Sequence, residues 1–308
     1  MIYDVVIVGG GPAGLSAALT LGRGRRRVMV CDAGPRVDGT SPVQNFITRD
    51  GTTPEEFRSI ARAQLEPYTT VDVRDTRVDS IGGSRGAFDV HLGDGTTALA
   101  RRILLCTGMI DQLPELEGFR ELWGTSIFPC PYCHGWEVRG QSLGVLGTNP
   151  AAGQHAQLIR QWSDDVTFFV HTHDLSAAER AAMEARGIRT VTGEVERLVI
   201  EGDRLIGVKL AGGLVVPLDA VFVRPGMQPR PDGLLQRLGC EFSETGFVKV
   251  DPTGKTSSNG VWAAGNASDP RAQVITAAGQ GSAVAIAING ELTQQDIDRA
   301  LGRSALHA

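Results

Sequence analysis

The chain begins with a short, continuous apolar run that leads into a glycine cluster. Residues 2–8 (IYDVVIV) alternate too little for a strand with one exposed face, so they predict a fully buried parallel strand. A helix-periodic stretch from Leu15 to about Leu21 comes next, and a second apolar run ends at Asp32. This order of strand, glycine turn, helix, strand and acidic residue predicts a βαβ unit in a parallel sheet.

Similar patterns continue along the chain. Loop residues punctuate positions 34–55, and a helix is predicted to begin near residues 53–55. A small-residue helix after residue 273 is expected to break at Asn289 and Gly290, before a short polar helix over 294–301. Further strands are predicted at 70–73, 88–92, 102–106, 141–146, 166–172, 246–250 and 260–264, with a helix between Gly147 and about Trp162.

The second strand–turn–helix–strand pattern, over residues 141–172, predicts a second nucleotide-binding unit. A chain of 308 residues is long enough for two domains with their own cores. We therefore expect an α/β fold with two Rossmann-like, three-layer ββα domains. Residues 113–231 form the second domain, which is inserted into a discontinuous first domain made of residues 1–112 and 232–308.

Composition and charge narrow the possible functions. A hydrophobic content of 42% and a charged content of 21% describe an ordinary globular protein, and the net charge of −5 argues against a broad nucleic-acid surface. No apolar run reaches the ~18 residues of a membrane span, and the start of the chain shows no signal peptide. A cytoplasmic, reducing location is the expectation.

The glycine cluster GGGPAG at residues 9–14 has the spacing of a dinucleotide-binding turn. Gly9 makes the tight turn, Gly11 lets the backbone approach a pyrophosphate, and Gly14 lets helix and strand pack closely. The helix start offers N–H groups to the phosphates. Asp32 stands 18 residues after Gly14, near the position of a ribose-binding acid. In this context the motif predicts a bound dinucleotide rather than a plain glycine-rich turn.

The segment FPCPYCHGWE at residues 128–137 carries redox chemistry. Cys130 and Cys133 can store two electrons as a disulfide or dithiol, and a helix start would lower the pKa of a thiol. His134 suits the role of a base for thiol protons. A zinc half-site lacks a second pair of ligands, and a structural disulfide does not fit the compartment. Tyr132 and Trp136 either line an apolar substrate pocket or pack the helix, and the sequence leaves both readings open.

Four motifs together resemble the low-molecular-weight thioredoxin reductase group of flavoproteins, over nearly the whole chain. They are GGGPAG at 9–14, CTG at 106–108, CPYC at 130–133 and GVWAAGN…QVITAAG at 260–279. The resemblance implies FAD in the discontinuous domain, an NAD(P)H-binding-like inserted domain that carries the CxxC, and a homodimer.

The resemblance also implies which residues contact FAD. Those for the ADP part are Gly9, Gly11, Pro12, Ala13, Gly14 and Asp32, and those along the cofactor are Asn45, Thr107 and Gly108. Gly265 and Asn266 match the pair that binds the ribityl chain, with Asn266 in place of the family's Asp, and Gln273, Val274 and Ala277 match the helix start that faces the isoalloxazine ring.

Three departures from the reductase pattern redirect the functional expectation. In the second glycine motif Asn149 replaces a glycine and Pro150 removes an N–H group. The arginine pair that would bind a 2′-phosphate is replaced by residues 171–174 (HTHD), whose two histidines we expect on one face at a strand end. His134 follows the CxxC where reductases have Asp. This CxxCH pattern is similar to that of the dithiol oxidases of gliotoxin and holomycin biosynthesis.

The expected activity is therefore FAD-dependent oxidation of a small-molecule dithiol, with no metal. By resemblance, a substrate thiolate attacks Cys130, a second substrate thiol resolves the mixed disulfide, Cys133 passes electrons to FAD, and oxygen is the acceptor. The alternative is a thioredoxin reductase-like enzyme that reduces a thioredoxin-like protein with NAD(P)H or another donor such as ferredoxin. A flavin-binding module without turnover leaves Cys130, Cys133 and His134 without a role. The residues leave open whether the inserted domain binds NADH, NADPH or neither.

Overall fold

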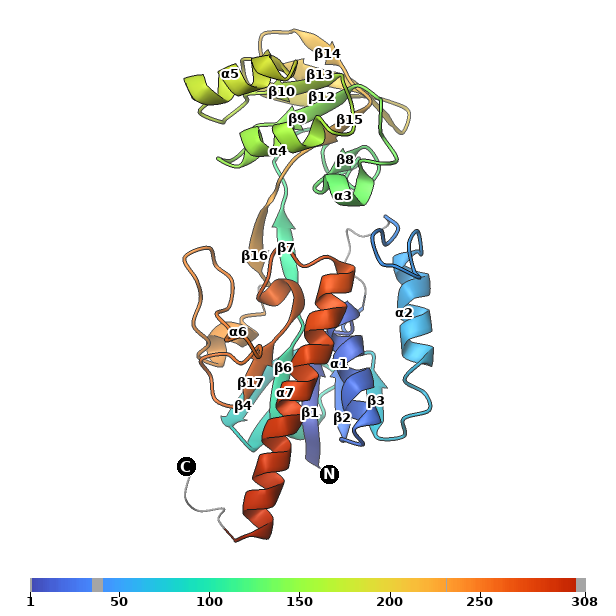
Figure 1. Ribbon diagram of the computed structural model, residues 1–308, viewed down its shortest axis with the longest axis vertical. Coiled ribbons are helices and arrows are strands. Elements are labelled where there is room, and N and C mark those ends of the chain that lie inside the picture. The colour runs from blue at the N-terminus through green and yellow to red at the C-terminus, as the bar shows by residue number, and fades with distance from the viewer. Residues whose placement is uncertain (1, 35–40, 231, 303–308) are drawn as a thin grey trace. The chain divides into compact units, whose positions relative to one another are not determined.

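A computed structural model describes residues 2–34, 41–230 and 232–302 of the 308. The chain divides into two compact units (Figure 1). The first takes in the described parts of residues 1–36, 54–110 and 227–308, and the second those of 37–53 and 111–226. Residues 41–53 thus belong to the second unit, although the sequence assigns them to the first domain. The predicted loop at 35–40 and the boundary residue 231 lie outside the described residues.

The first unit is built on a seven-stranded sheet with the order β3-β2-β1-β6-β5-β4, in which β17 also pairs with β6. Its strands are β1 (Ile2–Val8), β2 (Val28–Cys31), β3 (Val71–Arg74), β4 (Val78–Ser84), β5 (Ala87–Leu92), β6 (Thr97–Leu105) and β17 (Val261–Ala263). Its helices are α1 (Pro12–Arg23), α2 (Pro54–Ala63), α6 (Leu234–Arg237), the short 3₁₀ helix η1 (Gly265–Ala267) and α7 (Val274–Ala300).

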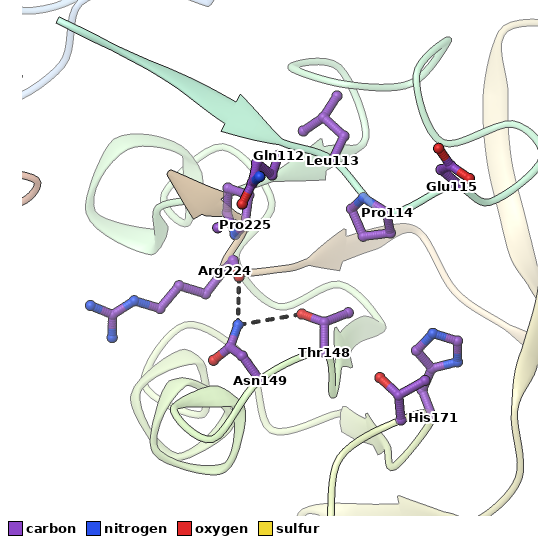
Figure 2. Close-up of a pocket in the computed structure, with 11 residues that line it drawn as sticks. Gln112, Leu113, Pro114, Glu115, Thr148, Asn149, His171, Arg224 and Pro225 are labelled. Carbon is purple, nitrogen blue, oxygen red and sulfur yellow. Dashed lines mark hydrogen bonds between the residues drawn. The ribbon is translucent and has the colours of Figure 1, made fainter. Parts of the chain in front are cut away.

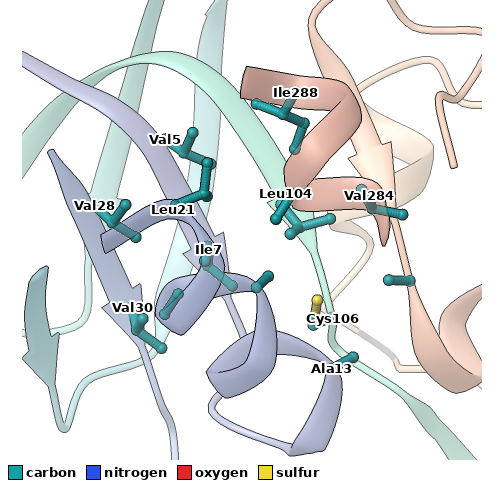
Figure 3. Packing of buried hydrophobic residues seen from close by; sticks show 14 of the residues in the cluster. Val5, Ile7, Ala13, Leu21, Val28, Val30, Leu104, Cys106, Val284 and Ile288 are labelled. Atoms are coloured by element: carbon teal, nitrogen blue, oxygen red, sulfur yellow. The ribbon is translucent and has the colours of Figure 1, made fainter. Parts of the chain in front are cut away.

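Helices α1 and α7 lie side by side against one face of this sheet (Figure 1). Figure 3 shows the core beneath them, where Ile7 and Leu104 of the strands meet Leu21 of α1 and Ile288 of α7. Each such fully buried aliphatic side chain stabilises the fold by roughly 1.5–3 kcal/mol. A Cβ atom on Gly281 would collide with the backbone of Ala13, so the two helices approach to backbone contact. This contact positions the starts of both helices at one end of the sheet.

The second unit has a five-stranded parallel sheet, β11-β10-β9-β15-β8, and a three-stranded antiparallel sheet, β12-β13-β14. One core lies between the two sheets, and another lies between the parallel sheet and its helices. The expected three-layer arrangement is therefore confirmed. The elements are β8 (Ile127–Phe128), β9 (Leu143–Leu146), β10 (Val166–Phe169), β11 (Arg189–Val191), β12 (Val195–Glu201), β13 (Arg204–Leu210), β14 (Val215–Pro217), β15 (Ala220–Phe222), α3 (Pro131–His134), α4 (Ala152–Ile159) and α5 (Ala177–Ala185).

Two further strands, β7 (Met109–Gln112) and β16 (Gly226–Pro229), pair with each other where the chain passes between the units. Among the described elements no helix is both long and apolar enough to span a membrane.

The C-terminal helix corrects one prediction. Helix α7 runs through Asn289 and Gly290 without a break. Arg26 donates from Nε to Asn289 Oδ1 at 2.7 Å and from Nη1 to Asp296 at 2.7 Å, and the Thr293 hydroxyl donates to the Asn289 carbonyl at 2.8 Å. A glycine inside a helix costs only about 1 kcal/mol, and these contacts at Asn289 and in the turns that follow it outweigh this cost.

Candidate functional site

The first glycine motif forms an open cradle at the start of α1. Gly11 is the N-cap of the helix, no side chain caps it, and Pro12 follows at the first helical position. A Cβ atom on Gly11 would meet no protein atom within 4 Å, whereas one on Gly14 would collide with the Gly9 carbonyl. The open side at Gly11 and the uncapped first turn leave room and N–H donors for a pyrophosphate.

Asp32 is buried at the end of β2 and already holds two cations. Its Oδ2 accepts hydrogen bonds from Arg58 at 2.9 Å and Arg62 at 2.7 Å, and its Oδ1 accepts one from the Gly34 N–H at 3.1 Å. Arg58 and Arg62 are four residues apart on α2 and therefore share one face of that helix. This spacing is visible in the sequence and could have identified the pair as partners of one carboxylate. A ribose bound here would share the carboxylate with both guanidinium groups.

The remaining residues assigned to FAD in the first unit converge on the same end of the sheet. Gly265 has a left-handed φ of 71°, and a Cβ atom there would lie 3.3 Å from that of Ala13 and 3.7 Å from that of Ala277. The Gly265 N–H donates to Gln280 Oε1 at 3.0 Å. Sequence reasoning missed Gln280, because nothing in its own neighbourhood marks a contact with a turn 15 residues away.

Four more of the residues assigned to FAD have defined positions in the first unit, and internal hydrogen bonds occupy part of two of them. The Asn266 amide nitrogen donates to the carbonyls of Asp269 and Ala272, at 2.9 and 3.1 Å, which leaves its oxygen for a ribityl hydroxyl. Arg230 donates to the Thr107 carbonyl at 2.9 Å. Gln273 is the N-cap of α7, and Val274 begins that helix. Together with Gly108, these positions line one end of the first unit, and the residues present fit FAD there.

Asn45 is the exception among the residues assigned to FAD, because it lies in the second unit with the thiols. Its side-chain amide donates to the Tyr132 carbonyl at 2.7 Å, and its own N–H donates to Asp50 at 2.7 Å. Asn45 adopts a left-handed φ of 62°, which asparagine tolerates better than most residues. The segment of residues 41–53 therefore packs against the CxxC helix.

The two thiols occupy the start of a single helical turn. Cys130 is the N-cap of α3, and its carbonyl accepts hydrogen bonds from the N–H groups of Cys133 at 3.3 Å and His134 at 3.2 Å. A hydrogen bond to the Cys130 side chain, together with burial, raises the pKa of Cys133. The lowering of the pKa expected at a helix start therefore does not hold for this thiol, because the hydrogen bond to Cys130 and burial both favour the protonated form. In the reduced pair, Cys133 keeps its proton.

His134 is held in one orientation by contacts on two sides. Its Nδ1 lies 3.2 Å from the Cys130 carbonyl, which can only accept, so the neutral ring carries its proton on Nδ1. Its ring stacks on Phe128 with centroids 4.6 Å apart and an interplanar angle of 16°. The Nε2 atom is buried and has no hydrogen-bond partner among the described residues. Burial lowers the pKa of His134, so at neutral pH Nε2 presents a lone pair.

Phe128 is held in position by the neighbouring strand of the parallel sheet. It pairs in register with Phe222 across β8 and β15, with ring centroids 5.7 Å apart, and His155 of α4 lies 6.4 Å beyond Phe222. Sequence reasoning did not assign Phe128 a role, because only the pairing of β8 with β15 brings this support together.

A pocket of about 390 Å³ lies beside α3 in the second unit. Its lining residues are Gln44, Asn45, Asp50, Tyr132, Cys133, Trp136, Glu137 and Trp162. Tyr132 and Trp136 are 57% and 66% exposed, so neither serves mainly to pack the helix. Tyr132 meets Trp162 edge to face, with centroids 5.6 Å apart. Of the two readings left open for Tyr132 and Trp136, the structure favours the lining of a pocket.

In the second glycine motif, Asn149 itself occupies part of the space and the hydrogen-bonding groups that a dinucleotide would use. Asn149 Oδ1 accepts a hydrogen bond from the Ala151 N–H at 2.9 Å, and the Asn149 carbonyl accepts one from the Ala152 N–H at 3.1 Å. Asn149 Nδ2 donates to the Arg224 carbonyl at 2.7 Å (Figure 2). Pro150 has no N–H. The N–H groups of Ala151 and Ala152, two of the donors at the start of α4, are thus used internally, beside a pocket of about 540 Å³.

The stretch that replaces the arginine pair also differs from its expected form. His171 and His173 lie in a turn after β10, not on one face of a strand. The Nδ1 of His171 accepts from the Val195 N–H at 3.1 Å. His173 Nε2 lies 3.1 Å from Glu179, and a Cβ atom on Gly153 of α4 would collide with that carboxylate. A carboxylate therefore stands where a dinucleotide would bring negative charge, and the residues here do not fit NAD(P)H.

The described part of the chain shows no cluster of metal-ligating side chains. No group of three or more His, Cys, Asp or Glu side chains is placed there to hold a metal ion. The five cysteines, Cys31, Cys106, Cys130, Cys133 and Cys240, are present as thiols.

Comparisons with known proteins agree with this geometry. The thioredoxin reductase tcpT of Claviceps purpurea is 32% identical over 279 residues, which cover 86% of each chain. A protein of Arthroderma benhamiae named "Probable thioredoxin reductase" is 37% identical over 176 residues, and the match spans 44% of that protein's length. The solved structure of HlmI is 44% identical, covers 98% of this chain and 96% of its own, and superposes with a TM-score of 0.92. The model of the pyridine nucleotide-disulphide oxidoreductase family matches residues 3–281. The chain therefore belongs to this family of FAD-binding oxidoreductases and is of the thioredoxin reductase-like kind.

Proposed function

We propose that this protein is an FAD-dependent thiol oxidase that closes a small-molecule dithiol into a disulfide through Cys130 and Cys133. The observation that carries the proposal is the self-filled second nucleotide site. Asn149 accepts hydrogen bonds from the N–H groups of Ala151 and Ala152 at the start of α4, Pro150 offers none, and Glu179 adds negative charge. With no fitting site for NAD(P)H, electrons enter from thiols and not from a nicotinamide.

The proposed reaction begins with the Cys130–Cys133 pair as a disulfide. A substrate thiolate attacks the Cys130 sulfur, a mixed disulfide forms, and Cys133 leaves with the electron pair. The second substrate thiol then attacks the substrate sulfur of the mixed disulfide, which releases the cyclic product and the Cys130 thiolate. FAD, if held by the residues of the first unit described above, would supply the two-electron acceptor for the Cys130–Cys133 dithiol, and oxygen would be the final acceptor and give hydrogen peroxide. In sum, one dithiol and one oxygen molecule give one disulfide and one hydrogen peroxide.

His134 is the proposed base for the protons of this reaction. Only a thiolate attacks a disulfide, so a substrate thiol must first lose its proton. The lone pair on Nε2 is free for this purpose, because Nδ1 is bound to the Cys130 carbonyl and the lowered pKa keeps the ring neutral. Cys133 keeps its proton in the reduced pair, so it too must be deprotonated before electrons leave.

Anaerobic reduction of the bound flavin tests the proposal. Dithiothreitol should bleach the flavin band near 450 nm, and air should restore it with one peroxide formed per dithiol. NADPH and NADH should bleach the band at least about a hundredfold more slowly than dithiothreitol does. Fast bleaching by either nicotinamide would support the thioredoxin reductase-like alternative instead.

The relay through the thiols is tested separately. Cys133→Ser should stop bleaching by dithiols while FAD stays bound, since serine cannot form the disulfide. Cys240→Ser is the matched control, because Cys240 is buried beside Thr256 in the first unit. Turnover that survives in Cys133→Ser would exclude the relay. The homodimer and the cytoplasmic location stay predictions of the sequence.

A further inference from the structure

A buried carboxylate stands directly behind the glycine turn of the first unit. Asp32 is 5% exposed, and a Cβ atom added to Gly10 would come within 2.4 Å of its Oδ2 atom, so the carboxylate lies against the backbone of the turn. The open cradle at Gly11, one residue further on, fits the negatively charged pyrophosphate of FAD. A carboxylate without a balancing charge would repel the cofactor here.

Two arginines of α2 balance this charge. Nη2 of Arg58 and Nη2 of Arg62 donate to Asp32 Oδ2 at 2.9 and 2.7 Å, so both guanidinium groups converge on the atom that lies against Gly10. Both side chains are only partly exposed, so salt screens these ion pairs less than it screens pairs at the surface. Arg62 also meets Asp75 at 2.6 Å, but that carboxylate is mostly exposed and the pair contributes little. We refer to Asp32, Arg58 and Arg62 as the arginine clasp, which carries one positive charge in sum.

The arginine clasp keeps hydrogen-bonding capacity for a ligand. Asp32 Oδ2 accepts from both arginines, whereas Oδ1 accepts from the Gly34 N–H at 3.1 Å and has room for a second donor. The Nε atom of Arg62 is buried and has no hydrogen-bond partner in the part of the chain that the structure describes. A buried N–H group without an acceptor costs stability. A ribose hydroxyl both donates and accepts, so it can satisfy a carboxylate oxygen and a guanidinium nitrogen.

Helix α2 depends on the arginine clasp for its place in the first unit. None of its ten residues is buried, and Ala61 packs at the edge of the core beneath α1 and α7. The helix lies beside α1 (Figure 1), with Arg58 and Arg62 on the face that meets Asp32. The two ion pairs are therefore a large part of what fixes the helix. A ligand that joins the clasp stabilises the helix in this position.

We propose that Arg58 and Arg62 are positioning residues for FAD, which balance the charge of Asp32 so that the glycine turn can receive the anionic end of the cofactor. In the same way they make the order of α2 depend on the cofactor, because the helix and the adenosine ribose share one carboxylate. The inference goes beyond the proposed oxidase function, since it concerns how the first unit holds FAD and not what the thiols act on.

Release of FAD from the holoenzyme measures the role of the two charges. Arg58→Gln and Arg62→Gln each remove one positive charge and keep an amide that can donate to Asp32. Each should raise the dissociation constant of FAD about five- to tenfold, the Coulomb effect of one charge several ångströms away at a high effective dielectric constant. The fluorescence of FAD that is freed on serial dilution gives this constant.

A matched control removes a positive charge elsewhere in the first unit. Arg77 forms an exposed ion pair with Asp79, at 2.6 Å, outside the arginine clasp. Arg77→Gln should change the dissociation constant of FAD by less than about twofold, because an exposed pair contributes little and is well screened.

The charge of Asp32 distinguishes neutralisation from packing. The Arg58→Gln/Arg62→Gln variant leaves the buried carboxylate without a cation. Adding Asp32→Asn removes that unbalanced charge, so the triple variant should bind FAD at least about fivefold more tightly than the double variant. If the arginines only pack, no such recovery occurs, because the triple variant lacks the same two side chains. Arg58→Lys/Arg62→Lys keeps both charges and should bind FAD to within about threefold of the native protein.

Hydrogen exchange followed by mass spectrometry tests the link to α2. In the native protein, the amides of residues 54–63 should exchange at least about fivefold more slowly with FAD bound than after FAD is stripped. In the Arg58→Gln/Arg62→Gln variant saturated with FAD, this protection should be lost. Exchange in β1 should stay as slow as in the native protein, which shows that the unit remains folded.

Three results would overturn the proposal. The first is an unchanged dissociation constant of FAD in both single variants, and the second is a triple variant that binds FAD no more tightly than the double variant. The third is exchange in α2 that does not respond to FAD. If the double variant does not fold, the lysine variant decides, because a loss of affinity as large as that of the single glutamine variants would refute the role of charge.

Discussion

The buried histidine behind the site offers a quantitative prediction. His155 is only 7% exposed, and its Nε2 has no hydrogen-bond partner among the described residues. Burial, with a smaller effect of the Arg224 guanidinium, lowers the pKa of His155 to about 4. The unfolded chain restores the ordinary value of about 6.5. Protonation below pH 6.5 therefore favours the unfolded state.

The size of the effect follows from these two values. Stability that His155 provides above pH 6.5 is lost as the pH falls from 6.5 toward 4, because the unfolded state binds the proton first. Between pH 7 and pH 5 this linkage amounts to about 2 kcal/mol of unfolding free energy. His155→Leu removes the titrating group and fills similar space, so the variant should lose about 2 kcal/mol less than the native protein over this interval.

Urea unfolding at pH 7 and pH 5 measures the difference. Tryptophan fluorescence reports mainly on the second unit, which holds Trp123, Trp136 and Trp162. His91→Leu, which replaces an exposed histidine of β5, is the control and should behave as the native protein does. An equal loss of stability in the native protein and in His155→Leu would refute the reasoning.

Three further predictions concern the base, the cofactor cradle and a buried ion pair. Phe128→Leu should expose the His134 ring, raise its lowered pKa toward 6.5 and move the acid limb of the flavin-reduction rate profile to higher pH. Gly11→Val should reduce FAD retention by at least about tenfold, measured as the 450 nm to 280 nm absorbance ratio after dialysis, because the new side chain meets no protein atom but fills the pyrophosphate space. Glu291→Ala should lower the free energy of unfolding, measured in urea, by about 3–5 kcal/mol. The substitution leaves Arg102, which is fully buried and 3.0 Å from Glu291 in the native protein, without its carboxylate partner.

Each of these has a contrary result, and two of them have a control variant. Phe168→Leu alters another buried phenylalanine of the second unit that does not contact His134, and a profile shifted equally in both variants would remove the role of the stack. Full FAD occupancy in Gly11→Val would show that the cofactor does not approach that position. Glu241→Ala breaks an exposed pair with Lys249 worth about 0–1 kcal/mol, so a similarly small effect of Glu291→Ala would contradict the importance of burial.

Local sequence patterns were sufficient to predict several helices and strands and the kind of chemistry. The apolar run at β1, the glycines at the start of α1 and the Cys130–Cys133 spacing each act within a few residues, so sequence alone identified them. The same locality explains why the predicted break in the C-terminal helix was wrong. An Asn-Gly pair weakens a helix by itself, but Arg26, from the other end of the chain, holds α7 together at Asn289 and Asp296.

The sequence by itself determined the α/β class, the family resemblance and the presence of a dithiol beside a candidate base. Only the tertiary structure showed that Asn149 fills its own nucleotide site, that Phe128 orients His134, and that Asp50 and Glu137 share a wall with Cys133. Asp50 and Glu137 are far apart in the sequence, and Asn149 and Phe128 also rely on the distant residues Arg224 and Phe222, so only a packed fold brings these contacts together. The spacing of motifs indicates which reaction is possible, whereas the direction of electron flow and the choice of substrate depend on such non-local contacts.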